Sequence, residues 1–173
     1  ELLDDRRQLE RLAGYPVRGM SYPYGSYTDA LAELLPSLGL AYGRTVESTG
    51  QFDLPRQFAK WHPTCHHRDM LATGQRFLDY YLPVKLVLYV WGHSFEFDRD
   101  GNWELVERFG ELIAGRNDIW YATNIEIAHY VDAQSRLVAS VDGDMLYNPT
   151  DMPVWVEADG DELEVPAGAT VKL

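Results

Sequence analysis

An alternation of strand-like and helix-like segments runs from residue 17 to residue 135 and constrains the fold more than any other feature. Short apolar runs bounded by glycine, proline or polar residues predict five strands, at residues 17–22, 40–46, 57–62, 84–91 and 119–122. Apolar positions spaced three and four residues apart predict the helices, at residues 2–13, 26–38, 67–82, 102–113 and 124–135. This order predicts βαβ units, a parallel sheet and right-handed crossovers.

Local signals predict where several of these helices begin and end. Ser26, followed three residues later by Asp29, has the form of a capping box and predicts a helix start. Gly14 and Gly39 are placed to end the first two helices, because glycine readily adopts the left-handed conformation of a helix cap. The polar residues 98–102 predict a turn before the fourth helix.

From residue 137 onward the pattern changes to short alternating runs separated by turns. Asp142-Gly143 and Asp159-Gly160 are turn dipeptides of the kind that join antiparallel strands. We therefore predict an α/β segment over residues 1–136 and an antiparallel β appendage over residues 137–173.

Charge and composition exclude several kinds of partner. The chain of 173 residues carries a formal net charge of −12, which repels phosphate backbones and anionic lipid. Its longest mostly apolar stretch, residues 82–91, includes Lys85 and is too short to cross a bilayer. Cys65 is the sole cysteine, so no internal disulfide can form, which favours a reducing compartment. We expect a cytoplasmic protein that binds neither nucleic acid nor membrane.

Two predicted strands end in residues suited to chemistry. Residues 18–25 stop at a glycine next to Tyr24, and residues 87–93 stop at a glycine next to His93. The carboxyl ends of parallel strands are where ligands and catalytic groups lie in barrels and open sheets. We therefore expect Tyr24 and His93 to line the same cavity.

Five segments carry a resemblance to a known family: Gly14-Tyr-Pro-Val-Arg18, Tyr22-Pro-Tyr-Gly25, Trp61-His-Pro-Thr64, Val90-Trp-Gly-His-Ser-Phe-Glu-Phe-Asp98 and Trp120-Tyr-Ala-Thr-Asn124. Together and in order they resemble the carboxy-terminal part of polysaccharide deacetylases, metal-dependent carbohydrate esterases with a NodB-like domain. The resemblance implies a partial (β/α) barrel of the deacetylase type, followed by the antiparallel β appendage.

The resemblance also implies that part of the catalytic machinery lies elsewhere. Members of the family begin with a strand ending in an Asp-Asp pair and a His-x-x-x-His segment, which supply the metal ligands and the base. Neither motif occurs in this chain. The expectation is therefore a fragment that is inactive alone, with zinc or another divalent metal bound by ligands outside this chain. Strand edges left exposed by missing units could drive homo-oligomerisation.

The resemblance assigns roles to individual residues. His93 is the general acid that protonates the leaving amine, a role that suits an imidazole near neutral pH. The backbone amide of Tyr24 helps to hold the oxyanion of the tetrahedral intermediate. Trp61 packs against substrate, and His62 stands where the family has an acidic residue. Arg18 could substitute for the arginine that the family's tyrosine motif carries.

The implied activity is hydrolysis of the acetyl amide of N-acetylated sugars or of a related small amide. The alternative is a non-catalytic carbohydrate-binding or interaction module that has lost the metal half and kept the aromatic side chains.

Further polar residues near these motifs have weaker functional interpretations. The group His62, Cys65, His66 and His67 could bind zinc by itself. However, it matches no zinc knuckle, and adjacent side chains on a turn usually diverge, so we expect no metal ligand in this chain. Glu96 could touch substrate hydroxyls, although acidic side chains in such loops are more often solvated.

Overall fold

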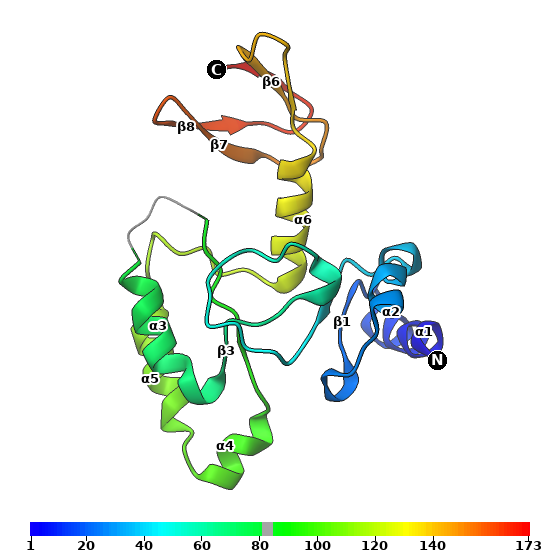
Figure 1. Cartoon of the computed structure of the whole chain (residues 1–173), viewed down its shortest axis with the longest axis vertical. Coiled ribbons are helices and arrows are strands. Elements are labelled where there is room, and N and C mark those ends of the chain that lie inside the picture. Colours follow the sequence, from blue (N-terminus) through cyan, green and yellow to red (C-terminus); the bar gives the residue numbers. More distant parts are fainter. Residues whose placement is uncertain (81–84) are drawn as a thin grey trace. The chain divides into compact units, whose positions relative to one another are not determined.

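The computed structural model describes residues 1–80 and 85–173 and divides into two compact units (Figure 1). The first unit is Glu1–Tyr121 and the second is Ala122–Leu173. We predicted the division between residues 136 and 137. In the structure it lies between residues 121 and 122, so the helix at residues 124–135 belongs to the β-rich unit. Within the described residues, no helix has both the length and the apolar character that crossing a membrane requires.

The described residues of the first unit form two pairs of parallel strands. They are β1 (Gly19–Ser21) with β2 (Tyr42–Arg44), and β3 (Cys65–His66) with β4 (Val90–Trp91). No sheet in the described part of the chain closes into a barrel.

An extended segment, residues 61–66, connects the two pairs. At its start, Trp61 forms a parallel bridge with Arg44 of β2, and its N–H donates to Gly43 O at 2.9 Å. At its end, β3 pairs with β4, and Thr64 N–H donates to Tyr89 O at 2.8 Å. The parallel strands are therefore arranged in the order in which they occur along the chain, from β1 to β4.

The amino-terminal helices follow the sequence signals closely. Helix α1 (Leu2–Ala13) ends at Gly14, which adopts the left-handed conformation at φ 76°. Helix α2 (Asp29–Leu34) continues into a 3₁₀ helix, η2 (Pro36–Leu38), which Gly39 ends in the same way. The predicted start at Ser26 is wrong by two residues.

The cap of α2 is Thr28, whose hydroxyl oxygen accepts from Leu31 N–H at 3.2 Å. Ser26 instead follows a 3₁₀ turn, η1 (Pro23–Gly25), that reverses the chain after β1. The segment therefore does contain a capping residue, but it is Thr28, two residues after Ser26, because the 3₁₀ turn delays the start of the helix.

Three predicted strands need correction. Residues 57–62 contain a 3₁₀ helix, η3 (Phe58–Lys60), so pairing begins only at Trp61. Of residues 84–91, Val90–Trp91 are strand, residues 85–89 are not, and residue 84 lies outside the described part. Residues 119–122 form no strand. There the Tyr121 hydroxyl donates to Ile113 O at 2.6 Å, which folds the loop back on the preceding helix.

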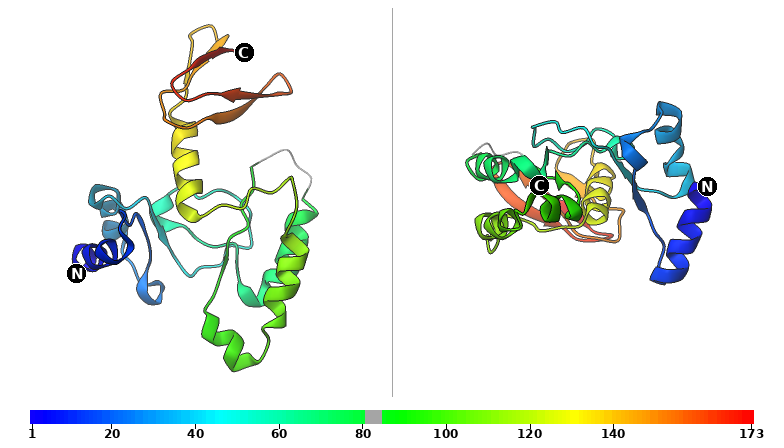
Figure 2. Two further views of the ribbon diagram at one scale, coloured as in Figure 1. Left: turned by 180° about the vertical axis from the view of Figure 1, so that it is seen from behind. Right: turned by 90° about the horizontal axis from the view of Figure 1, so that it is seen from below.

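The three middle helices are α3 (Met70–Leu78), α4 (Ser94–Asp100) and α5 (Glu104–Ile113). A 3₁₀ helix, η4 (His67–Asp69), leads into α3; residues 81 and 82 of the predicted helix lie outside the described residues. Both ribbon views show α3 and α5 side by side (Figures 1 and 2). Gly74 permits this packing, since a Cβ there would lie 3.0 Å from the ring of Phe109.

The predicted polar turn at residues 98–102 is wrong in its first part, because residues 98–100 belong to helix α4. The turn comes later, at Gly101, which ends α4 with φ 62°. The helix buries Phe97 against Cys65 and Met70, and this small apolar cluster fixes α4 next to β3.

The second unit begins with α6 (Asn124–Ser135), a helix with the predicted bounds that the prediction had assigned to the first part, and continues as antiparallel strands. Strands β5 (Val138–Ala139), β6 (Met145–Tyr147) and β9 (Thr170–Lys172) form one sheet. Strands β7 (Val154–Ala158) and β8 (Asp161–Val165) form a hairpin. The predicted antiparallel character of residues 137–173 is confirmed, and so is the turn at Asp159-Gly160, where both residues have positive φ.

A buried asparagine organises the loops of the second unit. Asn148 is 0 % exposed, and its amide donates to Met152 O at 2.8 Å and Val165 O at 2.9 Å. Its side-chain oxygen accepts from the N–H of Thr150 at 3.0 Å and from the Thr150 hydroxyl at 2.6 Å. One side chain therefore satisfies four polar groups of three residues, Thr150, Met152 and Val165.

Asn148→Ala should lower the free energy of unfolding of the second unit by about 2 kcal/mol, because its buried partners lose their hydrogen bonds. Urea unfolding followed by circular dichroism measures this change. Asn117→Ala, at an exposed loop position, is the matched control and should change stability by less than about 0.5 kcal/mol. Equal effects of the two substitutions would contradict the role given to Asn148.

Candidate functional site

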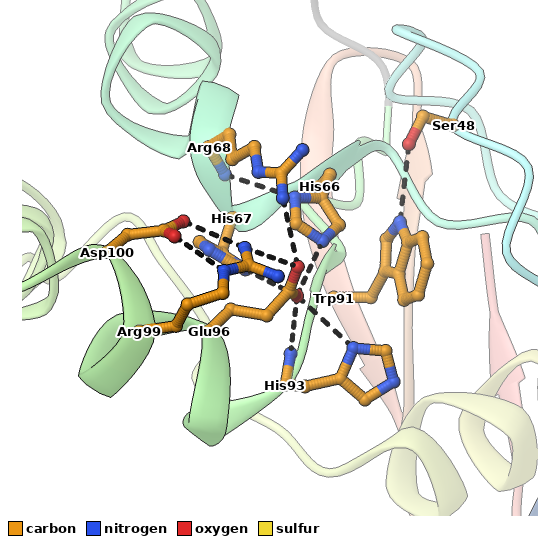
Figure 3. A network of polar contacts seen from close by, with 9 residues as sticks. All are labelled: Ser48, His66, His67, Arg68, Trp91, His93, Glu96, Arg99 and Asp100. Carbon is orange, nitrogen blue, oxygen red and sulfur yellow. Dashed lines mark hydrogen bonds and ion pairs between the residues drawn. The ribbon is translucent and has the colours of Figure 1, made fainter. Parts of the chain in front are cut away.

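Two strand-to-helix turns of the first unit meet and form a cluster of charged and imidazole side chains. Strand β3 ends at His66 and leads into η4, and strand β4 ends at Trp91 and leads into α4. Because His66 pairs with Trp91 in the parallel register, the residues that follow both strands lie together. We call the result the Glu96 cluster; its members are His66, His67, Arg68, His93, Glu96 and Arg99 (Figure 3).

Glu96 is the centre of this cluster and is only 7 % exposed. Its Oε2 atom lies 3.1 Å from His66 Nε2, 3.2 Å from His93 Nδ1 and 3.7 Å from His67 Nδ1. The backbone N–H of His93 donates to the same oxygen at 3.3 Å. Figure 3 shows the carboxylate pointing between the three imidazole rings.

The surroundings of Glu96 keep it ionised. Burial opposes the charge, but hydrogen bonds from the side chain and backbone of His93, together with the neighbouring His66, outweigh it. They lower the pKa of Glu96 from 4.5 to about 2. The ionised carboxylate can therefore accept an Nδ1–H of His93, which leaves Nε2 as the ring nitrogen available for proton transfer.

Two arginines hold the other oxygen of Glu96. Arg68 lies 3.1 Å and Arg99 3.5 Å from Oε1. Arg99 is also paired with Asp100 through two hydrogen bonds of 2.6 and 2.9 Å. These contacts fix the plane of the carboxylate and leave Oε2 directed at the histidines.

His67 is the most deeply buried member, at 3 % exposure, and burial lowers its pKa. Among the described residues neither of its ring nitrogens has a hydrogen-bond partner. Its ring packs on Phe97, with centroids 4.3 Å apart, and fills the space beside Gly92. A Cβ at Gly92 would lie 2.1 Å from His67 Nδ1, so this position requires a glycine.

Gly92→Ala should therefore displace the His67 ring and lower the free energy of unfolding by about 1–3 kcal/mol, the usual cost of overpacking. The matched control is Gly110→Ala, in α5, where a Cβ meets no atom within 4 Å. That substitution should raise stability by about 0.5–1 kcal/mol, because alanine favours a helix over glycine. Urea titrations of both variants measure the difference; a neutral Gly92→Ala variant would contradict the contact.

Trp91 forms an aromatic wall beside the cluster. Its ring lies edge-on to His66 at 4.9 Å and to His93 at 5.9 Å. Arg44 lies over the Trp91 ring, 5.2 Å from the centroid. The indole N–H of Trp91 donates to Ser48 Oγ at 3.3 Å (Figure 3). The imidazole of His93 therefore contacts both the carboxylate of Glu96 and the ring of Trp91.

Of the residues predicted to form a site, the structure places His93 in this cluster. Tyr24 is fully exposed and has the left-handed conformation at φ 55°, which is unusual for a residue other than glycine. In the described part of the chain, no hydrogen bond, ion pair or ring contact joins Tyr24 to His93.

The remaining predicted residues lie in other surroundings. Trp61 is 1 % exposed and packs in the core, so its ring has no free face for a substrate. His62 bonds Thr45 Oγ1 through Nδ1 at 2.7 Å and is one residue beyond the bridge to β2. Arg18 is exposed, and its carbonyl accepts from Ala41 N–H at 2.6 Å.

The role of Glu96 was missed by sequence reasoning, which placed it in a solvated loop. The available signal was its position three residues after His93, the spacing of a capping box. Because the residue at the cap is histidine rather than serine or threonine, the pattern was not recognised. The expectation that His66 and His67 diverge was also wrong: their rings lie 4.1 Å apart and both face Glu96.

Comparisons with known protein families, with curated proteins and with solved structures found no match to this chain.

Proposed function

We propose that this chain is the carboxy-terminal part of a (β/α)-barrel hydrolase that removes acetyl groups from N-acetylated sugars or a related small amide. The parallel order from β1 to β4, with α2 between β1 and β2 and α3 between β3 and β4, supports a partial barrel. The appendage of β5 to β9 then follows it. A single cysteine and the acidic surface favour the cytoplasm and a small neutral or cationic substrate rather than nucleic acid or membrane.

The observation that carries the proposal is the setting of His93. It follows β4 at the carboxyl end of the parallel strands, its side chain is half exposed, and its Nδ1 is bonded to an ionised carboxylate. This arrangement fixes the ring and presents Nε2 to an incoming group. On this proposal, His93 donates a proton from Nε2 to the nitrogen of the departing amine.

The proposal assigns a second role, stabilisation of the oxyanion, to Tyr24. Its left-handed backbone lies just beyond β1, at the same end of the parallel strands, and strained conformations of this kind gather at functional sites. On this proposal, the backbone N–H of Tyr24 donates a hydrogen bond to the oxyanion of the tetrahedral intermediate. A divalent metal such as zinc, when bound by residues outside these 173, would polarise the acetyl carbonyl.

The test is acetate release from N-acetylated sugar oligomers by the complete gene product and by this chain alone. We expect chelator-sensitive release by the former and none by the latter. Acetate release by the 173-residue chain that persists in chelator would refute the proposal.

A non-catalytic carbohydrate-binding module is the second candidate, supported by exposed aromatic rings around the cluster. Phe95 is well exposed and lies over His93, with centroids 5.1 Å apart and planes 31° from parallel. Glycan binding that survives His93→Ala, without acetate release by the complete gene product, would favour this candidate.

We also propose that the chain self-associates through strand edges. Strand β1 has a described partner on one side only, β2, and an edge of this kind offers unpaired backbone groups. Light scattering should give a mass above 19.8 kDa; a monomer at all concentrations would exclude this association.

A further inference from the structure

Three potential ligand atoms converge inside the Glu96 cluster. His66 Nε2, His67 Nδ1 and Glu96 Oε2 all lie within 4.8 Å of one another. Oε2 is 3.1 Å from His66 Nε2 and 3.7 Å from His67 Nδ1. In a tetrahedral site with bonds of about 2.0–2.1 Å, neighbouring ligand atoms lie roughly 3.4 Å apart. The two separations that involve Oε2 bracket that spacing.

The buried ring of His67 gives independent evidence that a ligand belongs here. Buried polar atoms in proteins are almost always hydrogen-bonded, yet both ring nitrogens of His67 lack a partner among the described residues. Its Nδ1 faces Glu96 at 3.7 Å, beyond hydrogen-bond distance. Burial favours its neutral form, which is the form that binds a metal. A metal ion on Nδ1 would satisfy the orphaned atom.

The donor set and its surroundings indicate the class of ion. Two imidazoles and a carboxylate suit zinc and its transition-metal neighbours, whereas magnesium and calcium prefer oxygen ligands alone. Arg68 and Arg99 orient the carboxylate through its other oxygen, as outer partners do in metal sites. Asp100 offsets the charge of Arg99, which limits repulsion of a cation.

We propose that His66, His67 and Glu96 form a binding site for a divalent transition metal of the zinc class, with water as the fourth ligand. The site differs from our expectation that the chain supplies no metal ligand. It also goes beyond the proposed function, which takes its metal from residues outside this chain. The cluster could otherwise be an ion-pair network around Glu96, but such a network leaves Nδ1 of His67 unsatisfied, whereas a bound metal ion would give that nitrogen a partner.

The test is titration of the chelator-treated 173-residue chain with Zn²⁺, followed by calorimetry. We expect one equivalent to bind, with no competition from Mg²⁺. His66→Ala and Glu96→Gln should each weaken binding by more than about 100-fold, since loss of even outer partners costs 10–100-fold. His62→Ala is the matched control, because His62 lies on the same segment but bonds Thr45, and it should bind zinc normally.

A measurement on the unaltered chain keeps the proposal testable if the variants misfold. The imidazole ¹⁵N resonances of His66 and His67 should shift on addition of Zn²⁺, while that of His129 should not. Co²⁺ should give the intense visible absorption of a tetrahedral site. Absence of stoichiometric binding, or shifts confined to other histidines, would overturn the site. No substrate is involved, so this result is separate from the deacetylase assay.

Discussion

Substitution of His93 by alanine is expected to lower kcat for acetate release by about 10²–10⁴-fold in the complete gene product, the usual contribution of a general acid. The side chain is half exposed, and the His93 backbone N–H still donates to Glu96 after the substitution. Folding should therefore be largely preserved. The loss would fall on kcat more than on KM, because proton donation matters only in the transition state.

Two readouts separate proton donation from a structural effect. An amide with a weakly basic leaving amine needs little protonation, so His93→Ala should harm its hydrolysis far less than that of a sugar amide. The pH–rate profile should also lose the limb that reports the acid. His129→Ala, at an exposed position on α6, is the control and should leave the rate unchanged. Equal losses for both kinds of leaving group would exclude His93 as the acid.

Substitution of Trp61 by alanine should lower the free energy of unfolding of the first unit by about 3–5 kcal/mol, as for other buried aromatic residues. The indole is 1 % exposed and lies edge-on to Phe58 at 5.0 Å, Tyr89 at 4.9 Å and Tyr42 at 5.9 Å. It also lies where the segment 61–66 joins β2, so its loss creates a cavity at the junction of the two strand pairs.

Urea unfolding followed by far-ultraviolet circular dichroism measures this change. Trp61→Phe should be milder, because it keeps part of the apolar volume. Trp155→Ala, at a half-exposed position on β7, is the matched control and should cost about 0.5 kcal/mol or less. If Trp61→Ala cost no more than Trp155→Ala, Trp61 would not be a core residue, and a role in substrate packing would be open again.

Elements with strong local signals could be predicted from the sequence. Helix α6 has the predicted bounds, and Thr123 and Glu126 form a reciprocal capping box at its start. Helix α1 ends where Gly14 permits the left-handed conformation. The hairpin of β7 and β8 turns at Asp159-Gly160 because both residues tolerate positive φ. Each of these signals involves residues that are close in sequence.

Strands were predicted less well, because their limits depend on distant partners. The run 57–62 has enough apolar residues for a strand, but the backbone forms a 3₁₀ helix until Trp61 meets Arg44. Residues 119–122 are all apolar or aromatic, yet no neighbouring strand pairs with them in the described structure. A strand requires a partner, and the sequence of one segment does not show whether that partner is present.

What the sequence determined by itself was the alternation of helices with short apolar runs, the antiparallel appendage and the position of His93 after a strand. Only the tertiary structure decided that Glu96 meets His66 and His67 and that Trp61 is enclosed in the core. These outcomes depend on the register of β3 with β4 and on the contact of 61–66 with β2. Burial and the pKa of a carboxylate arise from groups up to 30 residues away, so no local pattern specifies them.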